Sequence, residues 1–290
     1  MTEPIHLPFR VLAPPAETLP VVLSSPHSGR LYPSELISSL RFAPSALRPL
    51  EDGPVDRLAE GACAAGAILV AAVFPRAYVD LNRDSEELDP ALIPDLAPPR
   101  RLSARVRAGL GVIPSRLGGA ALYSRPLSLQ AVEQRLAHAY RPYHRQLASL
   151  LMDRRRRFGA SLLVDLHSMP SLLAGKGGGI VDVAIGDRFG RAAEPGFIAC
   201  ADRVLRQAGL SVGYNRPYAG GHITKHHGRP WDGISAVQLE FRRALFMDET
   251  TYEPRPGLGG IPELFTALVG ALAQVAVEIG ASAGRAALRA

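Results

Sequence analysis

The sequence predicts an α/β fold in which three layers, α/β/α, enclose a mixed and mainly parallel sheet. Short apolar runs of strand length alternate along the chain with longer segments of helical periodicity, and polar side chains directly follow several of these runs. Alternating strands and helices are typical of a sheet covered by helices on both faces. Hydrophobic residues make up 47% of the 290 residues, which is enough to build a core of this kind.

The N-terminal part of the chain begins this alternation. PVVLSSPHSG at 20–29 starts as a buried strand and breaks at Pro26. Residues 53–67 have Pro54 near a predicted helix start and small apolar residues along one face. AILVAAVFPRAYVDLNRD at 67–84 predicts a strand, a turn and a second strand.

A long loop and a long helix follow. Residues 91–119 are rich in Pro, Gly and Arg, which indicates a functional or mobile loop insertion. Residues 128–157 carry apolar side chains every three or four positions, so they predict a helix. Pro142 is expected to kink or divide this helix.

The C-terminal part repeats the alternation. LLVDLHSMP at 162–170 predicts a strand that stops at Pro170. The later elements are a glycine-rich turn at 174–179, a strand at 179–187, a helix at 194–209, a loop at 215–233, a strand at 234–242 and a C-terminal helix. We predict a single domain over residues 1–290, with a frayed tail at 283–290.

The positive charge does not by itself indicate a nucleic-acid partner. The net charge is +6, and the run RRRR at 154–157 is its densest part. This run ends a predicted helix just before Gly159, where cations interact favourably with the helix dipole and with solvent. No aromatic residues are interleaved with it, as a single-strand binding surface would require. No nucleic-acid partner is expected, and the arginines suit a small anionic substrate.

No membrane segment or secretion signal is predicted. The first ten residues lack a basic start followed by an apolar stretch. The longest apolar segment, at 264–279, is shorter than the roughly 20 residues that a bilayer requires, so we expect a buried helix. Cys63 and Cys200 have no metal-site spacing and are expected to be buried thiols of a reducing compartment, the cytoplasm. No feature indicates an oligomeric state.

Two histidines and a carboxylate suggest a metal site. His27 and His167 each lie at or just beyond the end of an apolar strand, and Asp56 lies near the first turn of the helix after His27. Ligands of open α/β sheets bind at the carboxyl ends of the strands, and two imidazoles with a carboxylate suit catalytic zinc. Either histidine alone could be a core residue paired with a carboxylate, and Asp56 could simply favour a helix start. Asp52 is the rival carboxylate.

Glu240 is the candidate proton acceptor. It lies inside the otherwise apolar strand VQLEF, where burial is unfavourable unless the carboxylate has a partner or a purpose. Arg242 or Arg243 could be that partner. The alternative is a general base beside a metal ion.

Arg76, Asn82 and Arg83 are candidates for binding an anionic substrate. All three belong to FPRAYVDLNRD, and guanidinium groups bind carboxylates through paired hydrogen bonds. Surface salt bridges are the alternative for any one of them.

These stretches together resemble the N-formylglutamate amidohydrolase family, which is related in fold to the zinc carboxypeptidases. The matching stretches occur in the family's order between roughly residues 20 and 250: SPHSG, DGPVDRLAEGA, FPRAYVDLNRDSEELDP, YRPYHRQLASLL, VDLHSMP, IGDRFG, NRPYAGGHIT and QLEFRRALFMDE. The resemblance implies a mixed sheet flanked by helices and a metal-dependent hydrolysis of an amide.

The resemblance also implies metal ligands. His27 and His167 match ligand positions. The carboxypeptidases carry a glutamate three residues after the first histidine, but this chain has Arg30 there, so Asp56 is the expected substitute. One zinc ion is expected, and cobalt or manganese would suit the same donors.

Further roles follow from the same resemblance. Glu240 corresponds to the general base, and Asn82 with Arg83 corresponds to a pair that holds a substrate carboxylate. Arg76 would stabilise the oxyanion or hold a second carboxylate, and Tyr218 lies where carboxypeptidases carry a mobile tyrosine.

The implied reaction is the hydrolysis of N-formyl-L-glutamate, or a similar N-acylated acidic amino acid, to formate and glutamate, in histidine breakdown. Two alternatives remain open, an amidase or carboxypeptidase for another N-acyl amino acid or short peptide, and a basic binding protein without activity. His222, His226 and His227 lie in a loop whose glycines and Lys225 favour a flexible, substrate-covering segment over a second metal site.

Overall fold

The main sheet of the computed structural model has seven strands in the order β1-β3-β2-β6-β9-β7-β8. The structure describes the whole chain except residues 1–6, 15, 17, 98–100, 172–180 and 288–290. The strand bounds, in sheet order, are Phe9–Leu12, Ile68–Ala72, Val21–Ser25, Ser161–Met169, Ile234–Arg242, Val183–Gly186 and Val212–Tyr214. Strands β2, β6 and β9 are parallel, and β7 pairs parallel with β8 and antiparallel with β9. The predicted mixed, mainly parallel sheet is therefore confirmed.

The chain divides into two compact units, and each unit is assembled from three separate stretches. The first unit comprises Met1–Arg10, Pro26–Glu51 and Ala71–Arg145, and the second comprises Val11–Ser25, Asp52–Val70 and Gln146–Ala290. A single domain over residues 1–290 stays a prediction.

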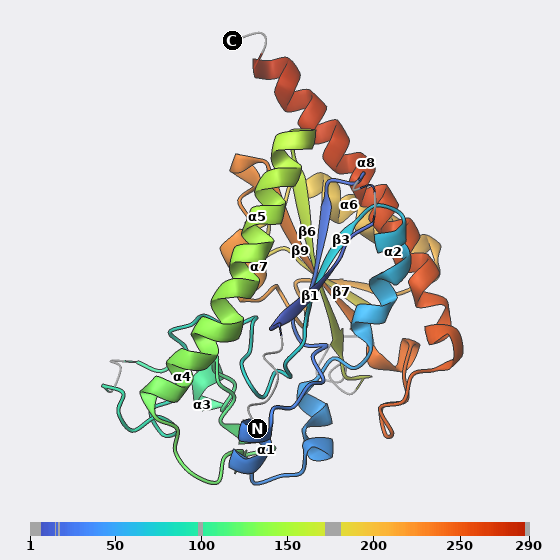
Figure 1. Cartoon of the computed structure of the whole chain (residues 1–290). Helices are drawn as coiled ribbons and strands as arrows, with labels where there is room; N and C mark the ends of the chain where they lie inside the picture. The colour runs from blue at the N-terminus through green and yellow to red at the C-terminus, as the bar shows by residue number, and fades with distance from the viewer. Residues whose placement is uncertain (1–6, 15, 17, 98–100, 172–180, 288–290) are drawn as a thin grey trace. The chain divides into compact units, whose positions relative to one another are not determined.

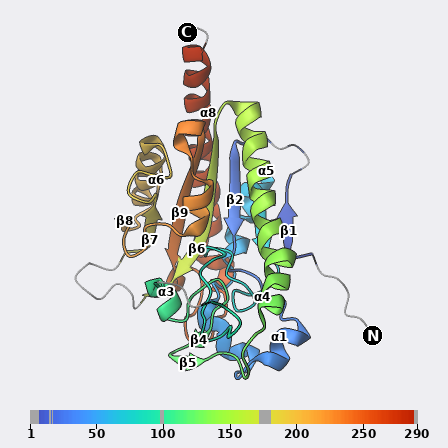
Figure 2. The ribbon, with the colours of Figure 1, turned by 90° about the vertical axis from the view of Figure 1, so that its left-hand side faces the viewer.

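The second unit has three layers. Figure 1 shows its sheet between the helix α5 on one side and the helices α2, α6 and α8 on the other. These helices span Arg141–Phe158, Glu60–Ala64, Pro195–Gln207 and Ile261–Ala287. Figure 2 shows β8, β7, β9, β6 and β2 side by side across this unit. The predicted three-layer α/β/α arrangement is confirmed.

The two central strands are covered on both faces. All nine residues of β6 are buried, as are the first eight of β9. Strands buried on both faces have nearly continuous apolar sequences rather than alternating ones. The polar side chains inside them, including His167 and Glu240, are therefore exceptions that need partners.

The predicted long helix is interrupted beside Pro142. Helix α4 spans Leu129–Arg135, a π-helical turn spans Leu136–Tyr140, and α5 follows directly. Proline lacks the N–H of a helical hydrogen bond, and its ring clashes with the carbonyl four residues earlier. The widened π turn accommodates this proline.

Several expected loops contain short elements. The segment 91–119 contains α3 (Ala104–Arg107) and β4 (Arg116–Leu117), which pairs with β5 (Ala120–Ala121). The expected loop 215–233 contains the helix α7 (His222–His227). Helix α1 spans Ser34–Ser39, and short 3-10 turns span Pro44–Leu50, Val55–Ala59, Pro230–Asp232, Arg243–Leu245 and Pro256–Gly260.

Two predicted segments differ in the structure. The second strand expected within 67–84 is absent from this described part, where residues 73–84 form turns and bends after β3. The tail expected to fray from residue 283 is helical through Ala287. The glycine-rich turn predicted at 174–179 lies outside the described residues.

The arginine run at 154–157 is only partly a solvated helix end. Arg154 is buried, pairs with Asp153 at 2.6 Å and lies over the ring of Phe158. Arg156 and Arg157 are exposed, as predicted for the end of a helix.

Helix α8 is long and apolar enough, by length and composition alone, to cross a membrane. Its apolar stripe instead packs inside the second unit, where Phe265, Leu268 and Leu272 are buried and the ring of Phe265 meets Phe241 edge to face at 6.1 Å. This agrees with the expected buried helix. Cys63 and Cys200 are buried free thiols, also as expected.

Candidate active site

Strands β6 and β9 place four polar side chains together in the core of the second unit. His167 pairs in register with Glu240, and Asp165 pairs with Gln238. Residues two apart on a strand point to the same face, so all four share one face of the sheet. All four are buried.

Carboxylates hold both ring nitrogens of His167. Asp52 Oδ2 lies 2.9 Å from Nδ1, and Asp165 Oδ2 lies 2.9 Å from Nε2. The other oxygen of Asp165 accepts a hydrogen bond of 2.9 Å from Ser24 Oγ. Burial alone would lower the pKa of His167, but Asp165 and Asp52 outweigh it and hold the pKa well above its usual value.

Glu240 has an unusual protonation equilibrium. Gln238 Nε2 donates a 2.7 Å hydrogen bond to Glu240 Oε1, and the amide of Gly221 in turn donates to Gln238 Oε1 at 2.7 Å. Burial raises the pKa of Glu240 to about 8, with His167 acting to lower it and the charges of Asp52 and Asp165 acting to raise it. A carboxyl group with a pKa this close to neutrality can both accept and deliver a proton.

The donor atoms of this cluster suit a cation. Asp52 and Asp165 place two carboxylates on either side of His167, and Nη2 of Arg243 lies 3.7 Å from Asp52 Oδ1. Clustering buried carboxylates is unfavourable unless positive charge compensates them. Imidazole and carboxylate donors are those that zinc prefers in proteins.

The structure places Asp52 against His167. Asp56 is buried in the first turn of Val55–Ala59. Asp52 lies four residues earlier, and its carbonyl oxygen accepts a 3.0 Å hydrogen bond from Ser168 Oγ, next to His167 on β6. Asp52 was the rival carboxylate in the sequence, and its pairing with His167 favours it over Asp56.

His27, in the first unit, also has a buried carboxylate partner. It follows the end of β2 by two residues, and its Nε2 lies 2.7 Å from Asp80 Oδ1. Asp80 also accepts hydrogen bonds from Arg76 Nε at 2.7 Å and from the amide of Asn82 at 2.9 Å. Burial would raise the pKa of Asp80, but Arg76, Arg83 and His27 together lower it well below its usual value.

Arg83 is held by backbone carbonyls. Its Nε donates to Leu110 O at 2.9 Å and its Nη1 to Asn82 O at 2.9 Å, while Tyr140 Oη donates to the carbonyl of Arg83 at 2.7 Å. The Arg83 side chain is therefore fixed before any ligand binds. The first unit thus brings Arg76, the backbone amide of Asn82 and Arg83 together around Asp80, and their role in substrate binding stays a prediction.

The three histidines of α7 contact one another through their rings. His222 stacks on His226 with ring centroids 5.2 Å apart, and His226 meets His227 edge to face at 4.8 Å, all within α7. Tyr218 is partly exposed in the loop before this helix. His144 lies 3.0 Å from Leu81 O and packs on Tyr140.

Sequence reasoning missed Asp80 and Gln238. Asp80 is fully buried, as are its neighbours Val79 and Leu81. The sequence pattern that could have identified it is an acidic residue between two apolar ones. Gln238, like Glu240, is a polar residue inside an apolar strand. It was missed because its side chain is uncharged.

Comparisons with known proteins identify the family of the chain. The model of the family "N-formylglutamate amidohydrolase" matches residues 19–247. The chain is 32% identical to the N-formylglutamate deformylase of Pseudomonas aeruginosa over 239 residues, which cover 80% of this chain and 83% of the relative. It is also 32% identical to the N-formylglutamate deformylase of Pseudomonas putida over 243 residues, with the same coverage.

Solved structures show the same relationship. The crystal structure of N-formylglutamate amidohydrolase from Ralstonia eutropha JMP134 matches with a TM-score of 0.86 and 35% identity, covering 94% of this chain and 99% of that one. A gene product of Agrobacterium tumefaciens shares the fold, with a TM-score of 0.65 and 20% identity over 94% of this chain and 98% of its own. The chain is therefore a hydrolase that belongs to the N-formylglutamate amidohydrolase family.

Proposed function

We propose that this enzyme hydrolyses the amide of N-formyl-L-glutamate to formate and glutamate and that the reaction depends on a bound metal ion. The names of its relatives support the substrate. The observation that supports the metal dependence is the pair of buried carboxylates, Asp52 and Asp165, that lie against the two ring nitrogens of the buried His167. The same evidence is consistent with a cytoplasmic enzyme of histidine breakdown.

The proposed metal ligands are His27 and His167, with Asp52 as the carboxylate, because its Oδ2 lies 2.9 Å from Nδ1 of His167. Asp165 holds Nε2 of His167 and Asp80 holds Nε2 of His27, so in each histidine Nδ1 is the nitrogen assigned to the metal. Carboxylates that bind the second nitrogen of a metal-ligating histidine fix its orientation and tautomer. The donors fit zinc, and also cobalt or manganese.

A zinc ion bound by these residues would lower the pKa of a water molecule and polarise the formyl carbonyl. Glu240 acts as the general base: it takes the proton of the attacking water and then delivers a proton to the departing amine of glutamate. Gln238 holds Oε1 of Glu240, so the proton moves through Oε2.

The arginines of the first unit provide the binding energy for the substrate's carboxylates. We assign one carboxylate to Arg83 with Asn82, because Arg83 is already fixed by two backbone carbonyls. Arg76 would stabilise the oxyanion or hold the second carboxylate, and one good donor to an oxyanion contributes about 3 kcal/mol. Tyr218 is assigned to cover the bound substrate.

Formate release from N-formyl-L-glutamate by the purified enzyme tests this function. We expect activity that disappears after chelation and returns when zinc is added. N-acetyl-L-glutamate and N-formyl-L-alanine are matched controls that change only the acyl group or the side-chain carboxylate. Full activity after complete removal of metal would contradict the metal dependence, and a preference for either control would contradict the substrate.

A further inference from the structure

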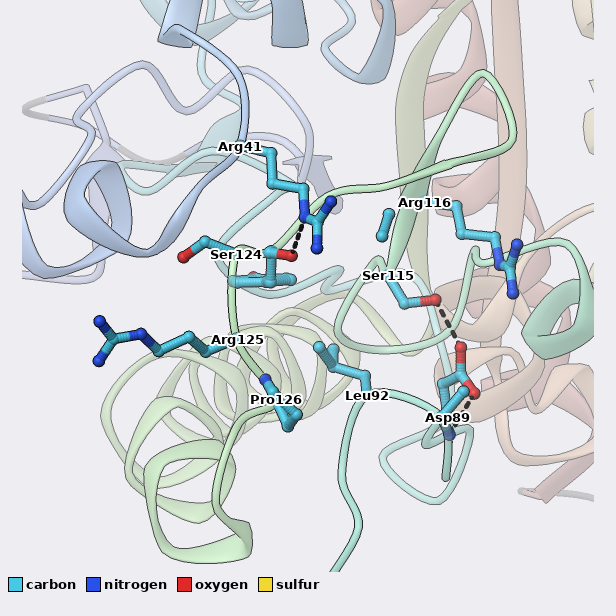
Figure 3. A pocket seen from close by; sticks show the side chains of 11 residues that line it. Arg41, Asp89, Leu92, Ser115, Arg116, Ser124, Arg125 and Pro126 are labelled. Atoms are coloured by element: carbon cyan, nitrogen blue, oxygen red, sulfur yellow. Dashed lines mark hydrogen bonds between the residues drawn. The ribbon is translucent and has the colours of Figure 1, made fainter.

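A pocket of about 250 Å³ lies entirely within the first unit (Figure 3). Its walls come from residue 41 and from the stretches 89–92, 115–116 and 121–126. Three arginines line it, Arg41, Arg116 and Arg125, and Asp89 is the one acidic residue among the described lining residues. None of these residues belongs to the proposed catalytic group.

Asp89, the acidic residue of the pocket, already accepts hydrogen bonds from other residues of the wall. Asp89 is buried, and its Oδ2 accepts a 2.5 Å hydrogen bond from Ser115 Oγ. Its Oδ1 accepts a 2.9 Å hydrogen bond from the amide of Ala91. One carboxylate against three guanidinium groups leaves the lining with an excess of positive charge.

Arg41 is held in place before any ligand binds. The bridge between Leu40 and Tyr123 aligns two stretches of backbone, with Arg41 N donating to Leu122 O at 2.9 Å and Ser124 N donating to Ser39 O at 2.8 Å. Arg41 Nε donates to Tyr123 O at 2.9 Å. In Figure 3 its guanidinium group extends from this pairing toward the space between Ser124 and Ser115.

We propose that this pocket binds a small oxyanion, a carboxylate or a phosphate, with Arg41 as its main ligand. A guanidinium group fixed at Nε presents its terminal nitrogens as a planar pair that matches two anion oxygens. Arg116 and Arg125 are exposed and extend to opposite sides of the pocket, where their charge attracts an anion (Figure 3). Pockets for drug-sized ligands measure roughly 300–1,000 Å³, so this one suits a smaller molecule.

Calorimetric titration of the metal-loaded enzyme tests the proposal, with inorganic phosphate in one arm and succinate in the other. We expect saturable binding of at least one anion at a site that depends on Arg41, beside any binding at the proposed catalytic group. Arg41→Ala should weaken this binding at least tenfold and leave turnover of N-formyl-L-glutamate unchanged. Arg107→Ala is the matched control, because Arg107 is an exposed arginine of the same unit that does not line the pocket, and it should bind as the wild type does.

Two further variants distinguish binding in this pocket from binding at the proposed catalytic group. Arg125→Glu changes an exposed side chain and should weaken anion binding at least twofold at low salt. This variant still tests the pocket if Arg41→Ala fails to fold. Arg83→Ala, in the proposed catalytic group, should leave anion binding in the pocket unchanged. Absence of saturable binding, equal binding by the Arg125→Glu and Arg107→Ala variants, or loss of binding in Arg83→Ala alone would each overturn the proposal. The relative affinities for phosphate and succinate identify which oxyanion the pocket prefers.

Discussion

The two proposed metal-binding histidines have the same local arrangement, although they come from different units. In each, a fully buried aspartate lies within 3 Å of Nε2, Asp80 for His27 and Asp165 for His167. Each aspartate is itself held by further donors, Arg76 for Asp80 and Ser24 for Asp165. This repetition is the arrangement expected where imidazoles must keep one orientation and one tautomer.

The role of Glu240 can be tested by Glu240→Gln. Glutamine has nearly the same size and still accepts a hydrogen bond from Gln238, but it cannot take a proton from water. We expect formate release to fall by roughly 10²–10⁴-fold, with metal content and thermal unfolding close to those of the wild type. Rates near those of the wild type would contradict the assignment.

The third metal ligand can be tested with a matched pair of variants. Asp52→Asn and Asp56→Asn each remove one buried carboxylate from the same short segment. Because Asp52 contacts His167, we expect Asp52→Asn to reduce zinc affinity by at least about tenfold, while Asp56→Asn retains the metal. The zinc content of each variant after dialysis against a competing chelator measures this difference. Loss of zinc from Asp56→Asn alone would restore Asp56 as the ligand.

Among the helices, α8 depends on one close approach to the end of α5. A Cβ atom added to Gly280 would lie 2.0 Å from the carbonyl oxygen of Phe158 and 3.1 Å from the amide of Ala160. Gly159, between them, has a φ of +80°, which a side chain would strain. The C-terminal helix therefore requires glycine at this one crossing.

Two alanine substitutions in α8 should have opposite effects. Gly270 has open space around its Cβ position, so Gly270→Ala should raise the free energy of unfolding by about 0.5–1 kcal/mol through helix propensity alone. Gly280→Ala should lower it by about 1–3 kcal/mol, because backbone atoms must move apart. Urea unfolding of the two variants beside the wild type measures both changes. Stabilisation by both would show that the crossing tolerates a methyl group.

The elements differ in how well the sequence predicts them. The strand expected at 234–242 is observed as Ile234–Arg242, because an apolar run bounded by Gly233 has no competing structure. The strand expected after residue 76 is absent from the described chain, because the Asp80 carboxylate binds the amide of Asn82 and closes a turn. Local hydrogen bonds from side chains to the backbone determine whether a segment forms a turn or a strand. A pattern of apolar residues does not reveal them.

The choice of carboxylate could not be made from the sequence either. Asp52 and Asp56 both lie near the predicted helix start, and spacing favours neither. The difference is a contact between Asp52 and His167, which are 115 residues apart in the chain. In contrast, the positions of His167 and Glu240 inside buried strands were predictable, because a polar residue in an apolar run is visible in the sequence, and their roles stay predictions.

For the whole molecule, the proposed metal site predicts that stability depends on the metal. Binding to the folded state alone adds about 2.7 kcal/mol to the free energy of unfolding when free metal is at 100 times its dissociation constant. We therefore expect chelation to lower the urea midpoint of the wild type and zinc to restore it. Asp52→Asn is the control and should respond less. Equal midpoints with and without metal in the wild type would contradict binding at this site.

The pairing of β2 with β6 has a consequence for synthesis on the ribosome. Ser24 and Asp165, which are hydrogen-bonded where these strands pair, are 141 residues apart. At translation rates of about 5–20 residues per second, one edge of the apolar strand β2 waits roughly 7–28 s for its partner to be made. Its other neighbour, β3, emerges much earlier. The nascent chain thus carries a half-paired, aggregation-prone strand for about half of its synthesis, and we expect chaperones that act during translation to protect it.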